Sequence, residues 1–253
     1  IKKVREEIEF LHKQYNLELI YMIDDTFLAV SERRFEEMYE MYMDFRIPFW
    51  MNTRCETMTE RRAKKLEDMN MLRMNFGIEH GNPEYRKHIL KRSTSNETMI
   101  SAFEMTSGKK YVTVGDLIIG MPEENRKLVF DSINFTKLLP KNVERTGAFI
   151  FAPYHGTSLR ELAIKKGYIK DPDSICDITK PEESMLSQPQ LPRKELIGLA
   201  KTAGLYQMLP KSKWKFIKKA EGDDKEANEL RAQLRKDYNW LNKTLKRKEL
   251  AKH

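Results

Sequence analysis

The chain has 253 residues, of which 40% are apolar and 33% are charged, with a formal net charge of +8. These proportions are typical of a globular protein and exclude disordered, collagen-like and disulfide-rich chains, since the only cysteines are Cys55 and Cys176. No apolar run approaches the roughly 20 residues that a membrane-spanning helix needs. We therefore expect a protein without a membrane span, and the scarcity of cysteine fits a reducing cytoplasm.

The positive charge is concentrated near the C-terminal end. Residues 211–253 contain 14 Lys and Arg against 7 Asp and Glu, whereas the preceding part of the chain is nearly neutral. A basic tail beside a neutral body is compatible with a phosphate-binding arm, but it is more often a solvated helix. We favour the solvated helix.

Strand and helix patterns alternate from the first residue onward. Because residues 1–15 already have a helical pattern and lack an initial Met, we interpret the chain as a fragment or a processed chain whose N-terminal part is missing. Strands are predicted over residues 17–23, 48–51, 72–78, 111–119 and 146–151. Helices are predicted over residues 1–15, 32–45, 57–70, 94–108, 124–139 and 158–166, with a short one at Asn82-Pro83.

Cap residues support several of these helix starts. Ser31 precedes the second helix as a candidate N-cap. Thr57 with Glu60, and Thr94 with Glu97, have the spacing of capping boxes. These pairs predict where the third helix and the helix over 94–108 begin.

The strands are separated by stretches that each contain a helix, which is the βαβ repeat of a parallel sheet, either wound into a barrel or doubly wound. Beyond Gly167 the pattern weakens into a loop-rich stretch, followed by helices at about 193–203 and 224–247. We therefore expect an α/β domain over residues 1–170. Residues 171–253 are expected to form a loop-rich linker and a basic C-terminal helical segment.

Polar residues follow every predicted strand. In barrels and open α/β sheets, ligands bind at the C-terminal ends of the strands. Each polar group alone fits ordinary turn chemistry or a helix cap, but their occurrence after all five strands indicates a ligand site. The groups are Asp24-Asp25, Asn52-Thr53-Arg54, Glu79-His80-Gly81, Gly120-Met121-Pro122-Glu123-Glu124 and Pro153-Tyr154-His155-Gly156-Thr157.

These motifs, in this order, resemble the radical S-adenosylmethionine (SAM) superfamily. The resemblance also includes Thr26-Phe27 after the paired aspartates, Gly77-Ile78 before Glu79, and Leu90-Lys91-Arg92. It extends over roughly residues 1–170 and is closest to the branch that often carries an N-terminal cobalamin-binding domain. It implies a partial (β/α)6 TIM-like barrel that lacks its first strand and has a C-terminal helical extension.

The resemblance implies chemistry in which a [4Fe-4S] cluster and SAM bind at the strand ends. One-electron reduction then cleaves SAM to methionine and a 5′-deoxyadenosyl radical, which acts in oxidoreductase or methyl-transfer reactions. An electron donor such as flavodoxin or ferredoxin is implied as a partner. Cobalamin in a missing N-terminal domain stays open, as does the substrate, whether a small molecule or a macromolecule.

Roles carry over from the family residue by residue. Asp24 and Asp25 stand where the family binds the methionine amino group, and Glu79 stands where it binds the ribose or that amino group. Arg92 is placed to pair with the SAM carboxylate, or is a surface arginine. The full set implied for SAM is Asp24, Asp25, Asn52, Arg54, Glu79, Arg92, Gly120, Pro122 and Tyr154, in which Gly120 and Pro122 let adenine approach the backbone and Tyr154 lines its rim.

The chain departs from the family pattern in two ways. The cluster motif CxxxCxxC is absent, and Cys55 and Cys176 cannot replace its three clustered thiolates, so we expect no metal ligands within this sequence. His80 stands where the family usually has a small residue, and His155 stands where it often has Pro. Both histidines are candidates for the substrate side of the site, or are loop residues with satisfied hydrogen bonds.

A second class of function rests on the basic tail. Trp214, Phe216 and Trp240 lie among lysines, an arrangement that can stack bases and pair phosphates in a nucleic-acid-binding or tRNA-modifying protein of this superfamily. The same aromatic residues also fit a packing edge that docks the tail on the domain. We favour the packing edge over nucleic-acid binding.

Overall fold

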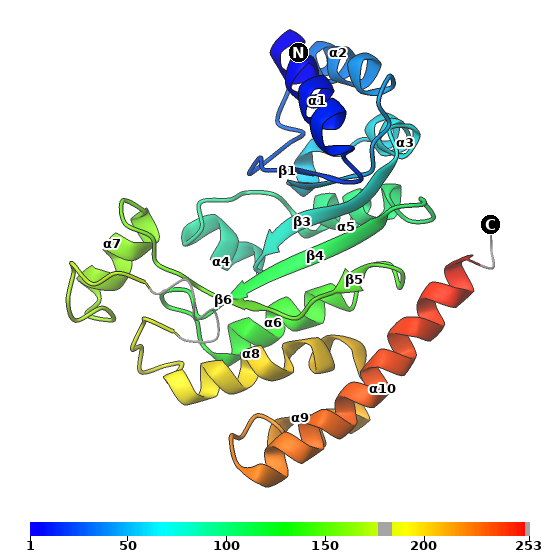
Figure 1. Cartoon of the computed structure of the whole chain (residues 1–253). Coiled ribbons are helices and arrows are strands. Elements are labelled where there is room, and N and C mark those ends of the chain that lie inside the picture. The colour runs from blue at the N-terminus through cyan, green and yellow to red at the C-terminus, as the bar shows by residue number, and fades with distance from the viewer. Residues whose placement is uncertain (177–183, 251–253) are drawn as a thin grey trace. The chain divides into compact units, whose positions relative to one another are not determined.

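The computed structural model describes residues 1–176 and 184–250, which form parallel strands joined by helices (Figure 1). The chain divides into two compact units and passes repeatedly between them. The first unit consists of Ile1–Gly77, Glu97–Gly115 and Asn142–Glu144. The second unit consists of Ile78–Asn96, Asp116–Lys141 and the described residues from Arg145 onward.

The secondary structure alternates as the sequence predicts. The strands are β1 (Ile20–Met22), β2 (Phe49–Thr53), β3 (Met71–Glu79), β4 (Val112–Ile119), β5 (Glu144–Arg145) and β6 (Phe149–Ile150). The α-helices are α1 (Lys2–Tyr15), α2 (Glu32–Tyr42), α3 (Glu60–Asp68), α4 (Pro83–His88), α5 (Asn96–Met105), α6 (Arg126–Thr136), α7 (Ser158–Lys165), α8 (Arg193–Met208), α9 (Trp214–Lys219) and α10 (Lys225–Leu250). Two 3₁₀ helices, η1 (Cys55–Thr57) and η2 (Lys211–Lys213), complete the described elements.

The sheet has the order β1-β2-β3-β4-β5, and β6 pairs with β4. The pairs β1–β2, β2–β3 and β4–β6 are parallel. Each parallel connection contains at least one helix, as βαβ units require. The mostly parallel α/β sheet confirms the predicted fold class.

The strands of the first unit have one apolar and one polar face. In β2, Phe49 and Met51 are fully buried, while Trp50 and Asn52 alternate with them and are half-buried. The Trp50 ring lies 4.7 Å from the ring of Tyr21 in β1, and Asn52 Nδ2 donates to the Tyr21 hydroxyl at 2.9 Å. The polar face therefore presents aromatic and amide groups held in fixed positions.

Helix caps explain where α2 and α3 begin. The Ser31 hydroxyl accepts a hydrogen bond from Arg34 N at 3.2 Å, as predicted. The predicted cap at Thr57 is wrong, because Thr57 Oγ1 donates to Arg54 O and closes η1. Thr59 caps α3 instead, accepting from Arg62 N at 3.2 Å.

The predicted strand over 146–151 is shorter in the structure, where only Phe149–Ile150 (β6) is extended in the sheet. Gly147 has a φ of +102°, which breaks the extended backbone and separates β5 from β6. A Cβ atom at Gly147 would lie 3.6 Å from the backbone of Gly204, so the chain passes close to α8 at this point. Helix α8 runs five residues beyond its predicted end at 203, and the sequence pattern did not predict α9.

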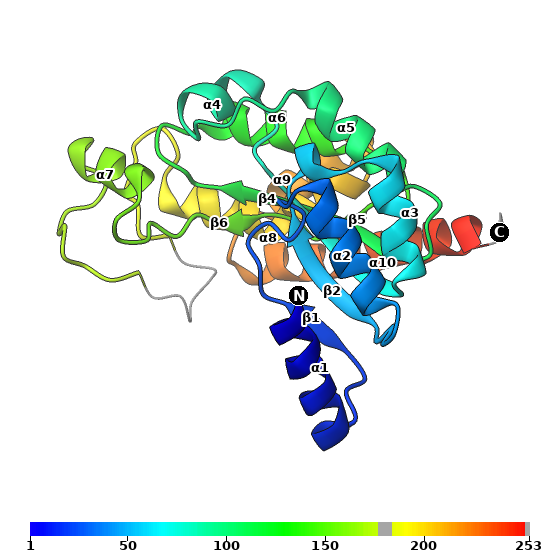
Figure 2. The same cartoon turned by 90° about the horizontal axis from the view of Figure 1, so that it is seen from above.

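Helices α6, α8, α9 and α10 build the main core of the second unit. Helices α8, α9 and α10 lie against one another in both views (Figures 1 and 2). The buried residues of this core are Ile119, Val129, Ile133, Leu191, Leu196, Leu199, Leu205, Tyr206, Leu209, Ile217, Ala220 and Leu234. The C-terminal helices are thus part of the same hydrophobic core as the end of β4.

The aromatic residues of the tail divide between core and surface. Trp214 packs on this core with its ring 5.2 Å from Phe130 and 5.3 Å from Tyr206, which supports the packing interpretation. Phe216 and Trp240 are 39% and 66% exposed. Within residues 1–176 and 184–250, none of the helices is long and apolar enough to cross a membrane.

Candidate functional site

The Asp24-Asp25 loop leaves the C-terminal end of β1 in the first unit. Both carboxylates are exposed. The loop is anchored two residues later, where the buried Phe27 donates its backbone N–H to Asn52 O at 3.0 Å. Because Asn52 lies near the end of the neighbouring parallel strand, the anchor holds the two carboxylates at the strand edge where ligands bind in such sheets.

The two candidates on β2 differ in their surroundings. Asn52 is half-buried, and its amide NH2 is used by Tyr21, as described above. Arg54 is exposed beyond the end of β2, with its guanidinium 4.0 Å from the Glu56 carboxylate. Arg54 thus remains open to an anionic group.

Glu79 and Arg92 form an ion pair in the second unit. Arg92 Nη1 donates to Glu79 Oε1 at 3.2 Å, and the two side chains are 14% and 27% exposed, respectively. Glu79 has a φ of +62°, a left-handed conformation that non-glycine residues rarely adopt and that clusters at functional sites. The pair presents an anion beside a cation, which matches the ammonium and carboxylate of an amino-acid group.

The turn Gly120–Pro122 follows β4 and is fixed through its backbone. Glu124 Oε2 accepts hydrogen bonds from Gly120 N and, at 3.2 Å, from Met121 N. On the other side, the Tyr85 hydroxyl donates to Pro122 O at 2.6 Å. These hydrogen bonds therefore hold the backbone of the turn in one conformation.

Gly120 is required by the conformation of this turn. Its φ is +83°, and a Cβ atom there would lie 2.5 Å from Leu196 Cδ2. Any other residue would combine backbone strain with a collision against α8. The glycine therefore allows the turn to lie close to the Leu196 side chain.

Glu124 is the buried centre of this arrangement. Its side chain is 0% exposed, and burial raises the pKa of its carboxyl, opposed by the contact with His80 and by the two backbone N–H groups. The sequence motif contained Glu124, but we assigned it no role from the sequence. The structure shows that its carboxyl shapes the turn on which two predicted site residues lie.

His80 is fully enclosed at the end of β3. It is 0% exposed and stacks on Tyr85 with ring centroids 4.2 Å apart. Its Nδ1 accepts from Asn82 N at 3.0 Å, and its Nε2 lies 3.2 Å from Glu124 Oε1. The burial does not support a substrate-side role for His80, and its contacts indicate that it positions Glu124.

Tyr154 and His155 occupy an exposed loop before α7. Tyr154 is 58% exposed, and His155 is exposed as well. The loop is fixed at its ends, where Arg160 Nη1 donates to Pro153 O at 2.8 Å and Thr157 caps α7. Their roles at the rim of the adenine and substrate site stay predictions.

The predicted SAM residues divide between the two units. Asp24, Asp25, Asn52 and Arg54 belong to the first unit. The second unit contains Glu79, Arg92, Gly120, Pro122 and Tyr154, together with His80 and His155. Within the second unit the structure joins Glu79 to Arg92, and fixes Gly120 and Pro122 in one turn.

The described residues do not fit a [4Fe-4S] cluster. Cys55 is buried in η1 of the first unit, and Cys176 is half-buried in the second unit. No group of three or more His, Cys, Asp or Glu side chains in the described part of the chain could hold a metal ion. By contrast, the Glu79–Arg92 pair places a carboxylate beside a guanidinium, a combination whose charges complement an ammonium and a carboxylate such as those of SAM.

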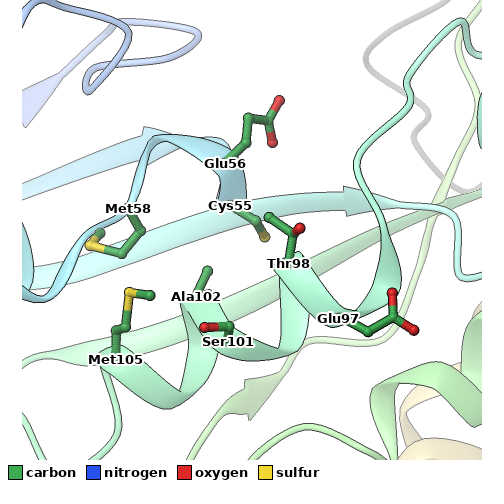
Figure 3. A pocket seen from close by; sticks show the side chains of 8 residues that line it. All are labelled: Cys55, Glu56, Met58, Glu97, Thr98, Ser101, Ala102 and Met105. Carbon is green, nitrogen blue, oxygen red and sulfur yellow. The ribbon is translucent and has the colours of Figure 1, made fainter.

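A pocket of about 360 Å³ lies between η1 and α5 in the first unit. Figure 3 shows Met58 and Met105 on its two sides, with the Glu97 carboxylate at one end. Its lining consists of Cys55, Glu56, Met58, Glu97, Thr98, Ser101, Ala102 and Met105. None of these is a predicted SAM residue, so the pocket and the candidate site have no residue in common.

Residues 1–136 match the family model described as the radical SAM superfamily. The chain belongs to the radical SAM superfamily. This membership confirms the resemblance inferred from the strand-end motifs. The matched segment ends at the last residue of α6 and includes the Glu79–Arg92 pair and the Gly120 turn.

One sequence relative of this chain carries the name of a methyltransferase. The chain is 30% identical over 165 residues to an uncharacterized methyltransferase of Pyrococcus horikoshii. The match covers 65% of this chain and 35% of the relative. The chain thus spans about a third of the relative's length.

Solved structures with the same fold include two radical SAM proteins. TsrM from Kitasatospora setae, a radical SAM methyltransferase with cobalamin and a [4Fe-4S] cluster bound, matches with a TM-score of 0.56 and 12% identity over 96% of this chain and 54% of TsrM. Coproporphyrinogen III oxidase (HemN) from Escherichia coli matches with a TM-score of 0.55 and 13% identity over 81% of this chain and 44% of HemN. At these identities, the likeness shows the fold.

Proposed function

We propose that this radical SAM protein is part of an enzyme that uses a [4Fe-4S] cluster to cleave SAM to a 5′-deoxyadenosyl radical. The radical would serve oxidoreductase or methyl-transfer chemistry on an unidentified substrate. The observation that carries this proposal is the Glu79–Arg92 ion pair, built on a left-handed Glu79 within the family-matched residues. The methyltransferase name of the sequence relative favours methyl transfer.

The chain's own residues would bind and orient SAM. Asp24 and Asp25 would accept hydrogen bonds from the methionine ammonium, and Arg92 would pair with its carboxylate. Glu79 would accept from the ribose hydroxyls or the ammonium. The turn at Gly120 would support the adenine ring, and SAM when bound would supply the radical or methyl chemistry.

Other components of this proposal are not supplied by the 253 residues of this chain. Because the sequence lacks CxxxCxxC, we propose that a part of the protein outside these 253 residues supplies the cluster cysteines. Cobalamin in a further domain and an electron donor such as flavodoxin or ferredoxin belong to the same proposal. A cytoplasmic location of the enzyme is also part of this proposal.

Anaerobic reconstitution of the 253-residue chain with iron and sulfide is expected to give no stoichiometric cluster. The reason is that Cys55 and Cys176 cannot provide three clustered thiolates. The measurement is iron and sulfide content together with visible charge-transfer absorption. A chain extended to include a CxxxCxxC motif from the same gene is the control, and stoichiometric loading of the 253-residue chain would contradict the proposal.

Asp24→Asn and Asp25→Asn are expected to weaken SAM binding by about tenfold each, because each removes a charge-assisted hydrogen bond to the ammonium. The thermal midpoint should change little, since both side chains are exposed. Binding is measured by calorimetry on the cluster-containing protein. Asp44→Asn is the matched control, because Asp44 is an exposed carboxylate of the same unit that pairs with Arg5. Normal SAM binding by both variants would assign Asp24 and Asp25 to the turn alone.

A further inference from the structure

Gln188 contacts the candidate adenine turn from a part of the chain beyond the family-matched residues. Its side chain is buried, with 3% exposure. Its Nε2 donates to Gly120 O at 3.1 Å and to Met121 O at 3.0 Å. One amide group therefore serves two successive carbonyls of the turn.

The two sides of the turn use different partners. Glu124 accepts from the N–H groups of Gly120 and Met121, while Gln188 donates to the carbonyl groups of the same two residues. Four backbone groups of a two-residue segment are thus fixed by two buried side chains. Such a segment has little freedom to change its dihedral angles.

The orientation of the Gln188 amide is itself fixed. Its Oε1 accepts from Gln190 Nε2 at 3.0 Å, and Gln190 Nε2 also lies 3.3 Å from the Tyr168 hydroxyl. The Tyr168 hydroxyl in turn donates to Glu123 Oε1 at 2.5 Å. This chain of hydrogen bonds starts and ends beside the turn, and it holds the Gln188 NH2 group toward the carbonyls.

The backbone that carries Gln188 is also anchored. Ser187 N donates to Tyr168 O at 2.9 Å, and Gln188 forms an isolated antiparallel bridge with Leu191. Leu196, eight residues later, also lies against Gly120, as described above. The segment around Gln188 is therefore built against the turn through both polar and apolar contacts.

We infer that Gln188 is a positioning residue for nucleoside binding, which holds the turn at Gly120 and Met121 in the conformation that accepts adenine. This inference rests on the proposed function, since it requires that the turn bind the adenine of SAM. Gln188 acts through the backbone of the turn. Loss of its two hydrogen bonds would lower the population of the binding-competent turn and so weaken the apparent affinity for the nucleoside.

The test uses 5′-deoxyadenosine as the probe, because it contains the adenine and ribose of SAM but needs no cluster. Calorimetry on the 253-residue chain is expected to show about tenfold weaker binding for Gln188→Leu. Gln207→Leu is the matched control. Gln207 is an equally buried glutamine of the same unit that donates to Gly147 O at 3.2 Å and makes no bond to the turn.

Gln188→Glu separates positioning from folding. An ionised carboxylate has no donor for the two carbonyls, whereas a protonated one has an O–H that restores one hydrogen bond. Burial raises the pKa of such a carboxyl, so affinity for 5′-deoxyadenosine should recover between about pH 8 and about pH 5.5. The wild-type chain should show no comparable recovery over the same range.

The outcomes are distinct. Weaker binding by Gln188→Leu, normal binding by Gln207→Leu and recovery of Gln188→Glu at low pH would support the inference. Normal binding by Gln188→Leu would overturn it, as would a Gln188→Glu variant whose affinity does not respond to pH. Failure of the wild-type chain to bind 5′-deoxyadenosine would instead contradict the proposed function of the turn.

Discussion

Glu124→Ala is expected to lower the free energy of unfolding of the second unit by about 3–5 kcal/mol. The substitution would leave the backbone N–H groups of Gly120 and Met121 buried without their acceptor. It would also remove the carboxylate that lies 3.2 Å from His80 Nε2. Two buried backbone donors would then lose their acceptor, and His80 would lose its neighbouring carboxylate.

Urea denaturation measures this loss, with Trp50 and Trp240 replaced by Phe so that the fluorescence of Trp214 reports on the second unit. Glu123→Ala is the matched control, because the neighbouring carboxylate is 34% exposed and, among the described residues, bonds only side chains, the Tyr168 hydroxyl and Lys166, and not the backbone of the turn. We expect the control to lose about 1 kcal/mol or less. Equal losses for the two variants would show that Glu124 does not have the structural role described here.

Glu221 connects three helices of the second unit. It follows α9, and its carboxylate accepts two hydrogen bonds from Arg126 at the start of α6, at 2.7 and 3.0 Å. It also accepts from the Tyr206 hydroxyl of α8 at 2.6 Å and from Lys218 of α9 at 3.0 Å. Burial alone would raise the pKa of Glu221, but these donors outweigh it and lower the pKa from its usual value.

Glu221→Ala is therefore expected to cost about 3–5 kcal/mol near neutral pH, since it leaves Arg126 and Tyr206 without their main acceptor. A carboxyl whose pKa is lowered by folding stabilises the protein above its unfolded-state pKa, and this contribution is lost as the pH falls through the folded-state pKa. The difference in stability between wild type and variant should thus shrink as the pH falls below about 4.5.

Glu195→Gln is the control for this effect. Glu195 also pairs with Arg126, at 3.0 Å, but its side chain is 30% exposed. We expect a loss of less than about 1 kcal/mol with little pH dependence. A Glu221→Ala variant as stable as the wild type near neutral pH, or a difference that grows on acidification, would contradict this account.

The sequence predicts the strands well because their apolar residues form short runs with clear boundaries. The predicted strand over 72–78 corresponds to β3 at Met71–Glu79, for example. The strand over 146–151 is shorter than predicted, since Gly147 has a positive φ where the chain passes close to Gly204, a residue distant in the sequence. Local patterns contain no information about that contact.

The site residues show the same contrast between local and long-range contacts. Glu79 and Arg92 were predicted from motifs, and they lie only 13 positions apart, in one local segment whose geometry brings the side chains together. Gln188 was not predicted, because it lies 68 residues from Gly120 and its Gln-Pro-Gln surroundings have only a loop signal. Sequence patterns identify residues that act within their own strand-end loop. They miss residues that reach the site only through long-range tertiary contacts.

His80 shows a different limit of sequence reasoning. A histidine directly after a strand in a polar motif resembles a site-facing residue. The left-handed Glu79 before it redirects the chain, and His80 becomes enclosed beside Glu124 and Tyr85. A positive φ at Glu79 has no signal in the sequence, since glutamate rarely adopts it.

The shared core of α6 and α8 has a consequence for the boundaries of any working fragment. The family-matched segment ends at residue 136, but Val129 and Ile133 of α6 pack on Leu196 and Leu199 of α8. The chain also crosses between the two units after residues 77, 96, 115, 141 and 144, so no single cut releases either unit intact. A truncation after residue 136 would expose the apolar face of α6. The boundaries of a fragment for domain grafting are therefore better chosen from the spatial units than from the family-matched segment.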